Sequence, residues 1–185
     1  MRTRARGFSM VEVLVVVVVV GLLMAIVIPR FRVSQTTKAR QAADQLVRDL
    51  EAARSRAIAT RSLTRVVISA LSSSYTGYLD SDRNGVLAES AAETSALESF
   101  RSRALEADVR IGRGTAADLP GYAGAGSITL PNSRVEFDSR GLTTPLGTSG
   151  VIYLQSVTEP SVITAVSVSG AAAIRSWVYR GGVWQ

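Results

Sequence analysis

The feature that most constrains this chain is an apolar run near its start, with one carboxylate at its head. Residues 13–28 carry no charged side chain, and Glu12 stands directly before them. As a helix, residues 8–28 measure roughly 30 Å at about 1.5 Å per residue, which matches the hydrocarbon layer of a bilayer. A charge near the centre of that layer costs on the order of 2.5–3.5 kcal/mol on insertion scales. The sequence therefore predicts a membrane-crossing segment in which Glu12 needs a partner.

Arg2, Arg4 and Arg6 precede this segment with no acidic residue among them. Because positive residues favour the cytoplasmic side, we expect the leader inside and the rest of the chain outside the cytoplasm. An ordinary secretory signal peptide has a shorter apolar region followed by a small-residue cleavage site, and residues 24–31 offer no such site. A plain signal anchor accounts for the length but gives no reason for Glu12.

A third interpretation rests on a motif. The stretch Gly7-Phe8-Ser9-Met10-Val11-Glu12-Val13-Leu14 resembles the class III signal of type IV pilins and type II secretion pseudopilins. The resemblance implies that a prepilin peptidase cuts after Gly7 and methylates the new N-terminus at Phe8. It also implies that Glu12 pairs with the N-terminal amine of a neighbouring subunit, which would compensate the buried charge and set the axial register. Pro29 stands where such proteins often carry a proline, and it is expected to kink the helix.

Composition argues against most enzymes. The 185 residues include no His and no Cys, so the usual general base, the thiol nucleophile and the soft metal ligands are absent. No Gly-x-Ser-x-Gly, Ser-x-x-Lys or Walker-type pattern occurs either. We expect no catalytic residues, no resident metal and no cofactor, although an active site built on Lys, Asp or Ser stays open as a membrane-anchored alternative. Removing the three leader arginines lowers the formal net charge from +6 to +3, which does not by itself indicate a nucleic-acid-binding protein.

Beyond Pro29 the apolar residues recur every three to four positions, which predicts an amphipathic helix that continues the stem over residues 30–60. Charged residues fall largely between the apolar ones, Asp49 among them. The expected buried stripe comprises small and aliphatic residues: Ala39, Ala42, Ala43, Leu46, Val47, Leu50, Ala53 and Ala57.

From residue 61 the apolar period changes to two, which is typical of half-buried strands. Strands are predicted at residues 63–69, 75–79, 127–130, 134–137, 151–156, 162–169 and 176–184. Residues 112–126 are rich in Gly and Ala, and we expect a mobile loop there. The whole predicts an α+β fold: a leader at 1–7, a transmembrane helix at 8–29, the stem at 30–60, and a mainly antiparallel β head at 61–185.

This head also resembles a family. The resemblance rests on the order and spacing of Thr76-Gly77-Tyr78-Leu79, the acidic turn after it, residues 135–141, and the strands at 151–155 and 162–170. In this order and spacing the head resembles the GspH/FimT group of minor pseudopilins and minor pilins. The resemblance implies a long helical stem packed on an antiparallel head.

The acidic turn itself could bind calcium. Asp80, Asp82, Asn84 and Gly85 match the first half of an EF-hand loop, but the twelfth position of that loop is Ala91, where calcium prefers a bidentate Glu. A simple Asp/Asn/Gly turn is the alternative and the expected reading.

Basic and aromatic residues gather near the C-terminus, where Arg175 and Arg180 flank Trp177 and Tyr179. Strand alternation makes core packing the default for the aromatic side chains. Arginines beside aromatics could also contact single-stranded DNA, which some FimT-type minor pilins are implicated in importing.

Taken together, these features predict a minor subunit of a type II secretion pseudopilus or a type IV pilus that primes or caps filament assembly, and not an enzyme. The alternative is a DNA-binding minor pilin involved in DNA uptake. The resemblance implies as partners the prepilin peptidase, major and minor pilin or pseudopilin subunits, and the inner-membrane assembly platform. It also implies a single-pass protein of the bacterial inner membrane with its head in the periplasm.

Overall fold

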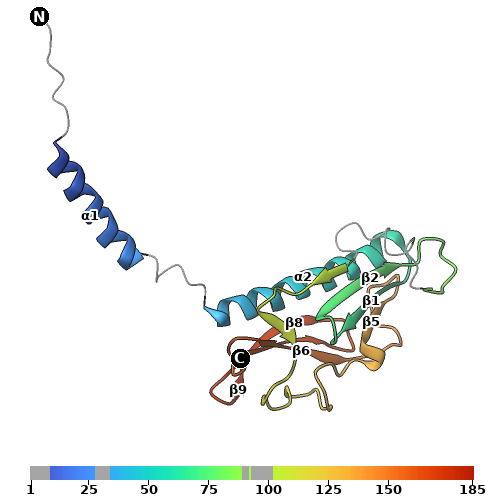
Figure 1. Ribbon diagram of the computed structural model, residues 1–185. Helices are drawn as coiled ribbons and strands as arrows, with labels where there is room; N and C mark the ends of the chain where they lie inside the picture. Colours follow the sequence, from blue (N-terminus) through green and yellow to red (C-terminus); the bar gives the residue numbers. More distant parts are fainter. Residues whose placement is uncertain (1–8, 28–33, 89–91, 93–101) are drawn as a thin grey trace, which may run out of the picture. The chain divides into compact units, whose positions relative to one another are not determined.

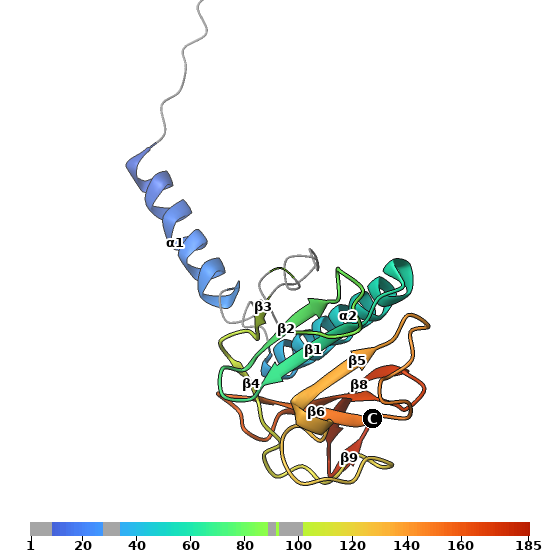
Figure 2. The same ribbon diagram turned by 90° about the vertical axis from the view of Figure 1, so that its right-hand side faces the viewer.

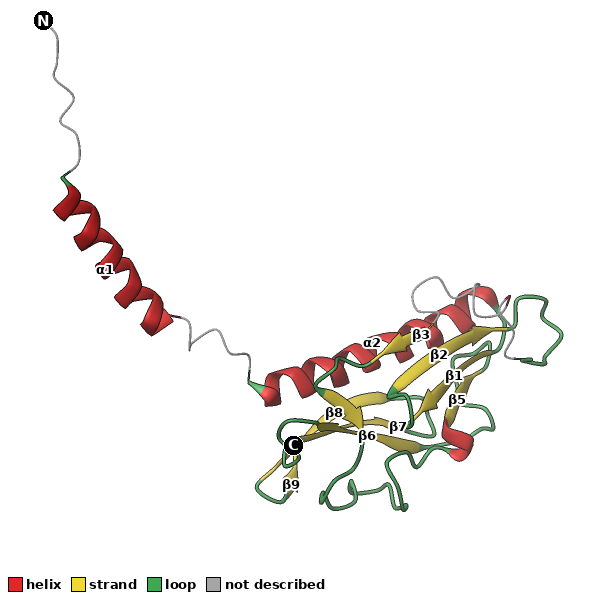
Figure 3. Cartoon of the chain, viewed as in Figure 1, coloured by secondary structure: helices red, strands yellow, loops and turns green. Residues whose placement is uncertain are grey.

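The computed structural model describes residues 9–27, 34–88, 92 and 102–185 (Figure 1). The chain divides into two compact units, one ending at Ser34 and the other running from Gln35 to Gln185. The first unit contains helix α1 (Met10–Val27), and the second contains helix α2 (Gln35–Thr60) and the strands of the head (Figure 3).

Helix α1 is apolar around its whole circumference, apart from Glu12 in its first turn. The side chains of residues 10–24 are all exposed. Among the residues that the structure describes, no helix reaches the length and hydropathy required to cross a membrane. The predicted span of residues 8–29 extends beyond the described residues at both ends, so it stays a prediction.

Helix α2 is amphipathic, and its buried stripe follows the predicted spacing. It begins at Gln35, directly after the non-helical Ser34, whereas the sequence placed its start at residue 30; residues 28–33 lie outside those described. The small alanines on this stripe let the helix backbone approach the strands closely, since Ala39, Ala53 and Ala57 are fully buried. The buried residues of the helix are Ala39, Ala42, Ala43, Leu46, Asp49, Leu50, Ala53 and Ala57.

Two antiparallel sheets form the head. The first has the order β3-β2-β1-β5 and contains β1 (Thr64–Ser69), β2 (Ser74–Leu79), β3 (Ser102–Ala104) and β5 (Arg134–Phe137). The second has the order β4-β6-β7-β8-β9 and contains β4 (Val109–Ile111), β6 (Gly150–Ser156), β7 (Ile163–Val168), β8 (Ile174–Arg180) and β9 (Val183–Trp184). A short 3₁₀ turn, η2 (Pro131–Ser133), leads into β5. The predicted α+β fold is confirmed.

Three strand predictions need correction. Residues 127–130 do not form a strand, and only Ile128 makes an isolated bridge, to Ile152. The predicted strand at 176–184 is a hairpin, because Gly181 and Gly182 both adopt positive φ and reverse the chain between β8 and β9. Strands β3 and β4 were not predicted, since three residues are too few to show an alternating pattern.

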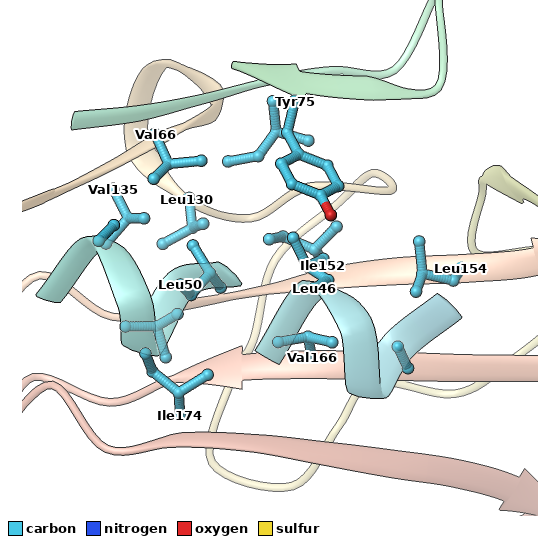
Figure 4. Close-up of a cluster of buried hydrophobic side chains, with 14 of the residues drawn as sticks. Leu46, Leu50, Val66, Tyr75, Leu130, Val135, Ile152, Leu154, Val166 and Ile174 are labelled. Carbon is cyan, nitrogen blue, oxygen red and sulfur yellow. The ribbon is translucent and has the colours of Figure 1, made fainter. Parts of the chain in front are cut away.

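The main core lies where α2 packs between the two sheets (Figures 2 and 4). Leu46 and Leu50 of the helix meet Val66 and Val135 of the first sheet and Ile152 of the second. Each of these side chains is at most 1% exposed. Burial of these side chains stabilises the head, at about 25 cal/mol per Å² of apolar surface removed from water.

A second apolar cluster lies on the other face of the five-stranded sheet. Residues 112–126, which the sequence predicted to be a mobile loop, cover this face: Leu119 is buried against Val151 and Tyr153. The Leu119 amide also donates a hydrogen bond to the Tyr153 hydroxyl at 3.0 Å. The segment has no regular structure, as predicted for a loop, and its buried contacts attach it to the sheet. Its mobility stays a prediction.

Candidate functional site

The N-terminal motif places one carboxylate on an otherwise uncharged helix. Glu12 lies in the first turn of α1, where its backbone amide donates to the Ser9 carbonyl at 3.0 Å. An acidic side chain suits this end of a helix, because the unpaired backbone amides there carry partial positive charge. Among the described residues, no cation forms an ion pair with Glu12.

Three other residues of the predicted N-terminal site cannot be placed. Gly7, Phe8 and Pro29 lie outside the residues that the structure describes. Cleavage after Gly7, methylation of Phe8 and a kink at Pro29 therefore stay predictions from the sequence.

The acidic turn after β2 is held together by its own side chains. The two carboxylate oxygens of Asp80 accept hydrogen bonds from the backbone amides of Asn84 at 3.1 Å and Gly85 at 2.8 Å. Asp82 accepts from the Asn84 side-chain amide at 2.7 Å, and the side-chain oxygen Oδ1 of Asn84 accepts from the Val86 backbone amide at 2.7 Å. Burial by itself raises the pKa of Asp80, but these hydrogen bonds outweigh it, so the pKa is lowered overall.

These contacts are those of an Asx-type turn, in which a side-chain oxygen accepts hydrogen bonds from backbone amides a few residues further on. Calcium binding stays a prediction, because a carboxylate oxygen that accepts a hydrogen bond can also bind a cation. No group of three or more acidic side chains within the described residues is close enough to hold a metal ion, and Ala91 is not among those residues. Asp80, Asp82 and Asn84 thus act together as a turn in this structure.

A second acidic turn, after β5, faces the first one. The Asp138 carboxylate accepts from the backbone amides of Arg140 at 2.8 Å and Leu142 at 2.9 Å, and from Arg140 Nε at 2.9 Å. Burial alone raises the pKa of Asp138, but these contacts lower it overall. Asp80 and Asp138 line one pocket of about 250 Å³ together with Arg61 and Arg83, so both turns belong to the same end of the head.

The two arginines predicted as DNA contacts are not brought together. Arg175 and Arg180 are both exposed on β8, but they are five positions apart, and strand alternation directs them to opposite faces of the sheet. Trp177 shares the face of Arg175 and donates its indole N–H to Ser167 Oγ at 2.9 Å. Trp177 also packs against the second apolar cluster, as the core interpretation predicted. The structure does not form one basic and aromatic surface from these residues.

One polar cluster was not predicted from the sequence. Asp49, expected between the apolar positions of the stem helix, is instead buried on its packing face. Its carboxylate accepts from the Tyr75 hydroxyl at 2.5 Å and the Gln45 side-chain amide at 3.0 Å, and Arg103 Nε lies 3.4 Å away. The signal that could have indicated this is the spacing, because Asp49 follows Leu46 by three residues and so lies on the apolar stripe.

Comparisons with known proteins agree with this geometry at two levels. Residues 2–28 match the family model of the prokaryotic N-terminal methylation motif. This match includes Gly7, Phe8 and Glu12, and it covers only the start of the chain. No curated protein is similar to the chain in sequence.

Solved structures match most of the chain in fold. The minor pseudopilin EpsH from the type 2 secretion system of Vibrio cholerae has a TM-score of 0.50 at 13% identity, over 79% of this chain and 99% of that one. A second structure of EpsH from Vibrio cholerae has a TM-score of 0.50 at 15% identity, over 77% and 95%. The type IV minor pilin FimU of Pseudomonas aeruginosa has a TM-score of 0.50 at 17% identity, over 80% and 92%.

The chain thus combines a prepilin-type N-terminal motif with the fold of minor pseudopilins and type IV minor pilins. At these identities the structural likeness defines the fold, and the motif is what links the chain to prepilin processing.

Proposed function

We propose that this chain is a minor subunit of a type II secretion pseudopilus or a type IV pilus, and that it acts by assembling with other subunits and not by catalysis. The observation that carries this proposal is Glu12: it is the one charge on α1, it lies within the matched methylation motif, and no cation pairs with it among the described residues. The fold of the head supports the same function.

In this proposal residues 8–29 anchor the precursor in the inner membrane, with the arginine leader in the cytoplasm and the head in the periplasm. A prepilin peptidase cuts after Gly7 and methylates Phe8. The new amine of one subunit then donates to the Glu12 carboxylate of its neighbour. In a low-dielectric filament core this ion pair satisfies both charges, and a subunit in the wrong axial register would leave both unpaired at a large energetic cost.

The head remains at the surface or the tip of the filament. There a subunit present in few copies would prime or cap assembly, and the inner-membrane platform would extract it together with the major and minor subunits. Pro29 would bend the stem as it leaves the packed core.

The test is Glu12→Ala in the full-length chain, produced in a host with its own filament machinery. Membrane insertion should be unchanged, because the substitution leaves the apolar segment intact. Incorporation into sheared filaments should be lost, because the neighbour's amine then has no acceptor. Val16→Ala, on the same helix and also exposed, serves as the control and should assemble normally. Normal assembly of Glu12→Ala would contradict the proposal.

Processing is tested separately by the intact mass of the mature protein. We expect it to begin at Phe8 and to carry the added mass of one methyl group. A mature chain that retains residues 1–7 would contradict the proposed peptidase step, whatever the behaviour of Glu12.

A further inference from the structure

An open polar groove lies on the head, away from the N-terminal motif. It has a volume of about 580 Å³ and is formed where the β1–β2 turn meets β4 and the segment after β4. Ser73 joins these two walls, because its hydroxyl oxygen accepts from the Ile111 amide at 3.1 Å and its carbonyl accepts from the Leu105 amide at 2.9 Å. Three of the side chains that line this groove are Leu71, Arg110 and Gln155.

Arg110 is held in a fixed orientation by a buried amide. Its Nε and Nη2 donate to Oε1 of Gln155 at 3.2 and 2.9 Å, and the two residues are directly opposite each other on β4 and β6. Gln155 is only 5% exposed and is itself anchored, since its Nε2 donates to the Pro160 carbonyl at 2.8 Å. A Cβ on Gly114 would lie 2.5 Å from that Nε2, so the glycine leaves room for this arrangement.

The orientation of Arg110 leaves donors available. A guanidinium has five N–H groups, and Gln155 takes two of them. No carboxylate within the described residues forms an ion pair with Arg110, which is exposed. Its neighbour Arg113 differs, because it pairs with Asp118 at 2.8 Å and donates to the carbonyls of Ala116 and Gly124. The groove therefore offers one pre-oriented cation whose charge is not neutralised.

The apolar side of the groove is formed by Leu71, at the tip of the β1–β2 turn, which is fully exposed at 103% of its reference area. An exposed leucine beside a rigid arginine suits a protein–protein interface, because the buried centre of such an interface is more apolar than the rest of the surface, and arginine is enriched there and binds carboxylates bidentately. A nucleic acid strand fits less well, because its binding depends on several cations that neutralise successive phosphates.

We propose that this groove binds an acidic side chain, flanked by an apolar residue, on a neighbouring subunit of the filament. The carboxylate accepts hydrogen bonds from Arg110, and the apolar residue covers Leu71. Gln155 acts as a positioning residue, because it determines where the guanidinium points. This inference rests on the proposed function, since it needs a filament neighbour.

A photo-crosslinking amino acid at position 71 of the full-length chain tests this directly in native filaments. Mass spectrometry of the crosslinked peptide should identify a segment of another subunit that contains Asp or Glu. Arg110→Glu should lower the crosslink yield about tenfold, which corresponds to ~1.4 kcal/mol. Replacing the partner's acidic residue with Arg should restore it. Arg175→Glu, an exposed arginine of the same sheet that does not line the groove, is the matched control and should leave the yield unchanged.

Gln155→Met tests the positioning role. The charge of Arg110 stays, but its orientation is lost, so the yield should fall to a level between wild type and Arg110→Glu while the melting temperature shows a folded head. A yield equal to wild type in both variants would overturn the inference. A second result would also overturn it: the wild-type chain forms no crosslink but binds a fluorescent single-stranded oligonucleotide, and Arg110→Glu abolishes that binding. The groove would then be a nucleic-acid site. Absence of the wild-type chain from filaments would instead contradict the proposed function itself.

Discussion

The two helices of this protein satisfy their apolar surfaces in opposite ways. Helix α2 has a stripe of small and aliphatic residues, and two sheets of the same chain cover it. Helix α1 is apolar on all sides, and its described side chains, residues 10–24, are exposed. A helix of the second kind requires lipid or other subunits around it. The comparison teaches that α2 builds the head, whereas no described side chain of α1 belongs to either apolar cluster of the head.

Their acidic residues differ in the same way. Asp49 of α2 is buried, and three side chains of its own chain surround it. Glu12 of α1 is exposed, and among the described residues no cation pairs with it. The contacts of Asp49 contribute to the packing of the head, whereas the role of Glu12 in assembly is the one proposed above.

The sharpest way to break this comparison is to remove the same side chain from both helices. Leu50→Ala should lower the free energy of unfolding of the head by about 2–5 kcal/mol, because Leu50 is fully buried between the sheets. Leu14→Ala, 62% exposed on α1, should change it by less than about 0.5 kcal/mol. Urea unfolding in detergent, followed by the fluorescence of Trp177 and Trp184, measures both. Equal effects would show that α1 belongs to the folding unit of the head.

The next largest effect is expected from the buried carboxylate. Asp49→Ala leaves the Tyr75 hydroxyl and Arg103 without this acceptor, and we expect a loss of about 2–3 kcal/mol. Asp44→Ala, on the same helix but partly exposed, removes only the hydrogen bond from Ser176 and should cost about 0.5 kcal/mol.

Tyrosine titration gives an independent measurement of the same contact. Burial, together with the hydrogen bond to Asp49, raises the pKa of Tyr75. The ultraviolet signal of this tyrosine at high pH should therefore shift toward lower pH in the Asp49→Ala protein. An unchanged titration would mean that Asp49 does not control the environment of Tyr75.

The acidic turns sharpen the comparison through pH, because carboxylates bound to backbone amides hold them together. The pKa of Asp80 is lower in the folded protein than its ordinary value of 3.8. Its stabilising contribution is therefore present above that pH and is lost as the pH falls through the lower, folded value. Asp80→Asn should cost about 1–2 kcal/mol at neutral pH and should flatten the fall in melting temperature between about pH 5 and about pH 2. Glu106→Gln, at an exposed residue, should leave that profile unchanged.

The smallest expected effect concerns the segment over the second cluster. Within residues 112–126, Arg113 forms an ion pair with Asp118 and donates hydrogen bonds to two backbone carbonyls. Its guanidinium carbon also lies 5.4 Å from the centre of the Tyr153 ring. Arg113→Ala should cost about 1 kcal/mol and should speed hydrogen exchange at the amides of Leu119 and Tyr122. Arg140→Ala, in the Asp138 turn, should leave those amides unaffected. Fast exchange at these amides in the wild type would support the prediction that residues 112–126 are mobile.

Local patterns predicted most of this fold. The period of the apolar residues located α2 to within five residues at its start and gave its end at Thr60. Alternation located β1, β2, β5, β6 and β7. Both signals work because burial on one face forces the same residue class to recur at the period of the element.

Contacts between distant residues could not be predicted in this way. Tyr75 meets Asp49 across 26 positions, and Arg110 meets Gln155 across 45. Glycine and alanine content suggested mobility for residues 112–126, but Leu119 in that segment is buried against Tyr153 of β6, which lies 34 residues further along the chain. No local pattern carries information about which strand will face such a residue.

By itself, the sequence determined what depends on neighbouring residues along the chain: the apolar segment with its single charge, the methylation motif, the periods of helix and strands, and the acidic turns. The tertiary structure alone decided which polar groups find partners inside the head and which keep donors for another molecule. The physical reason is that a hydrogen bond or an ion pair forms only within a few ångströms. That proximity is created by the packing of the whole fold and not by the order of the residues.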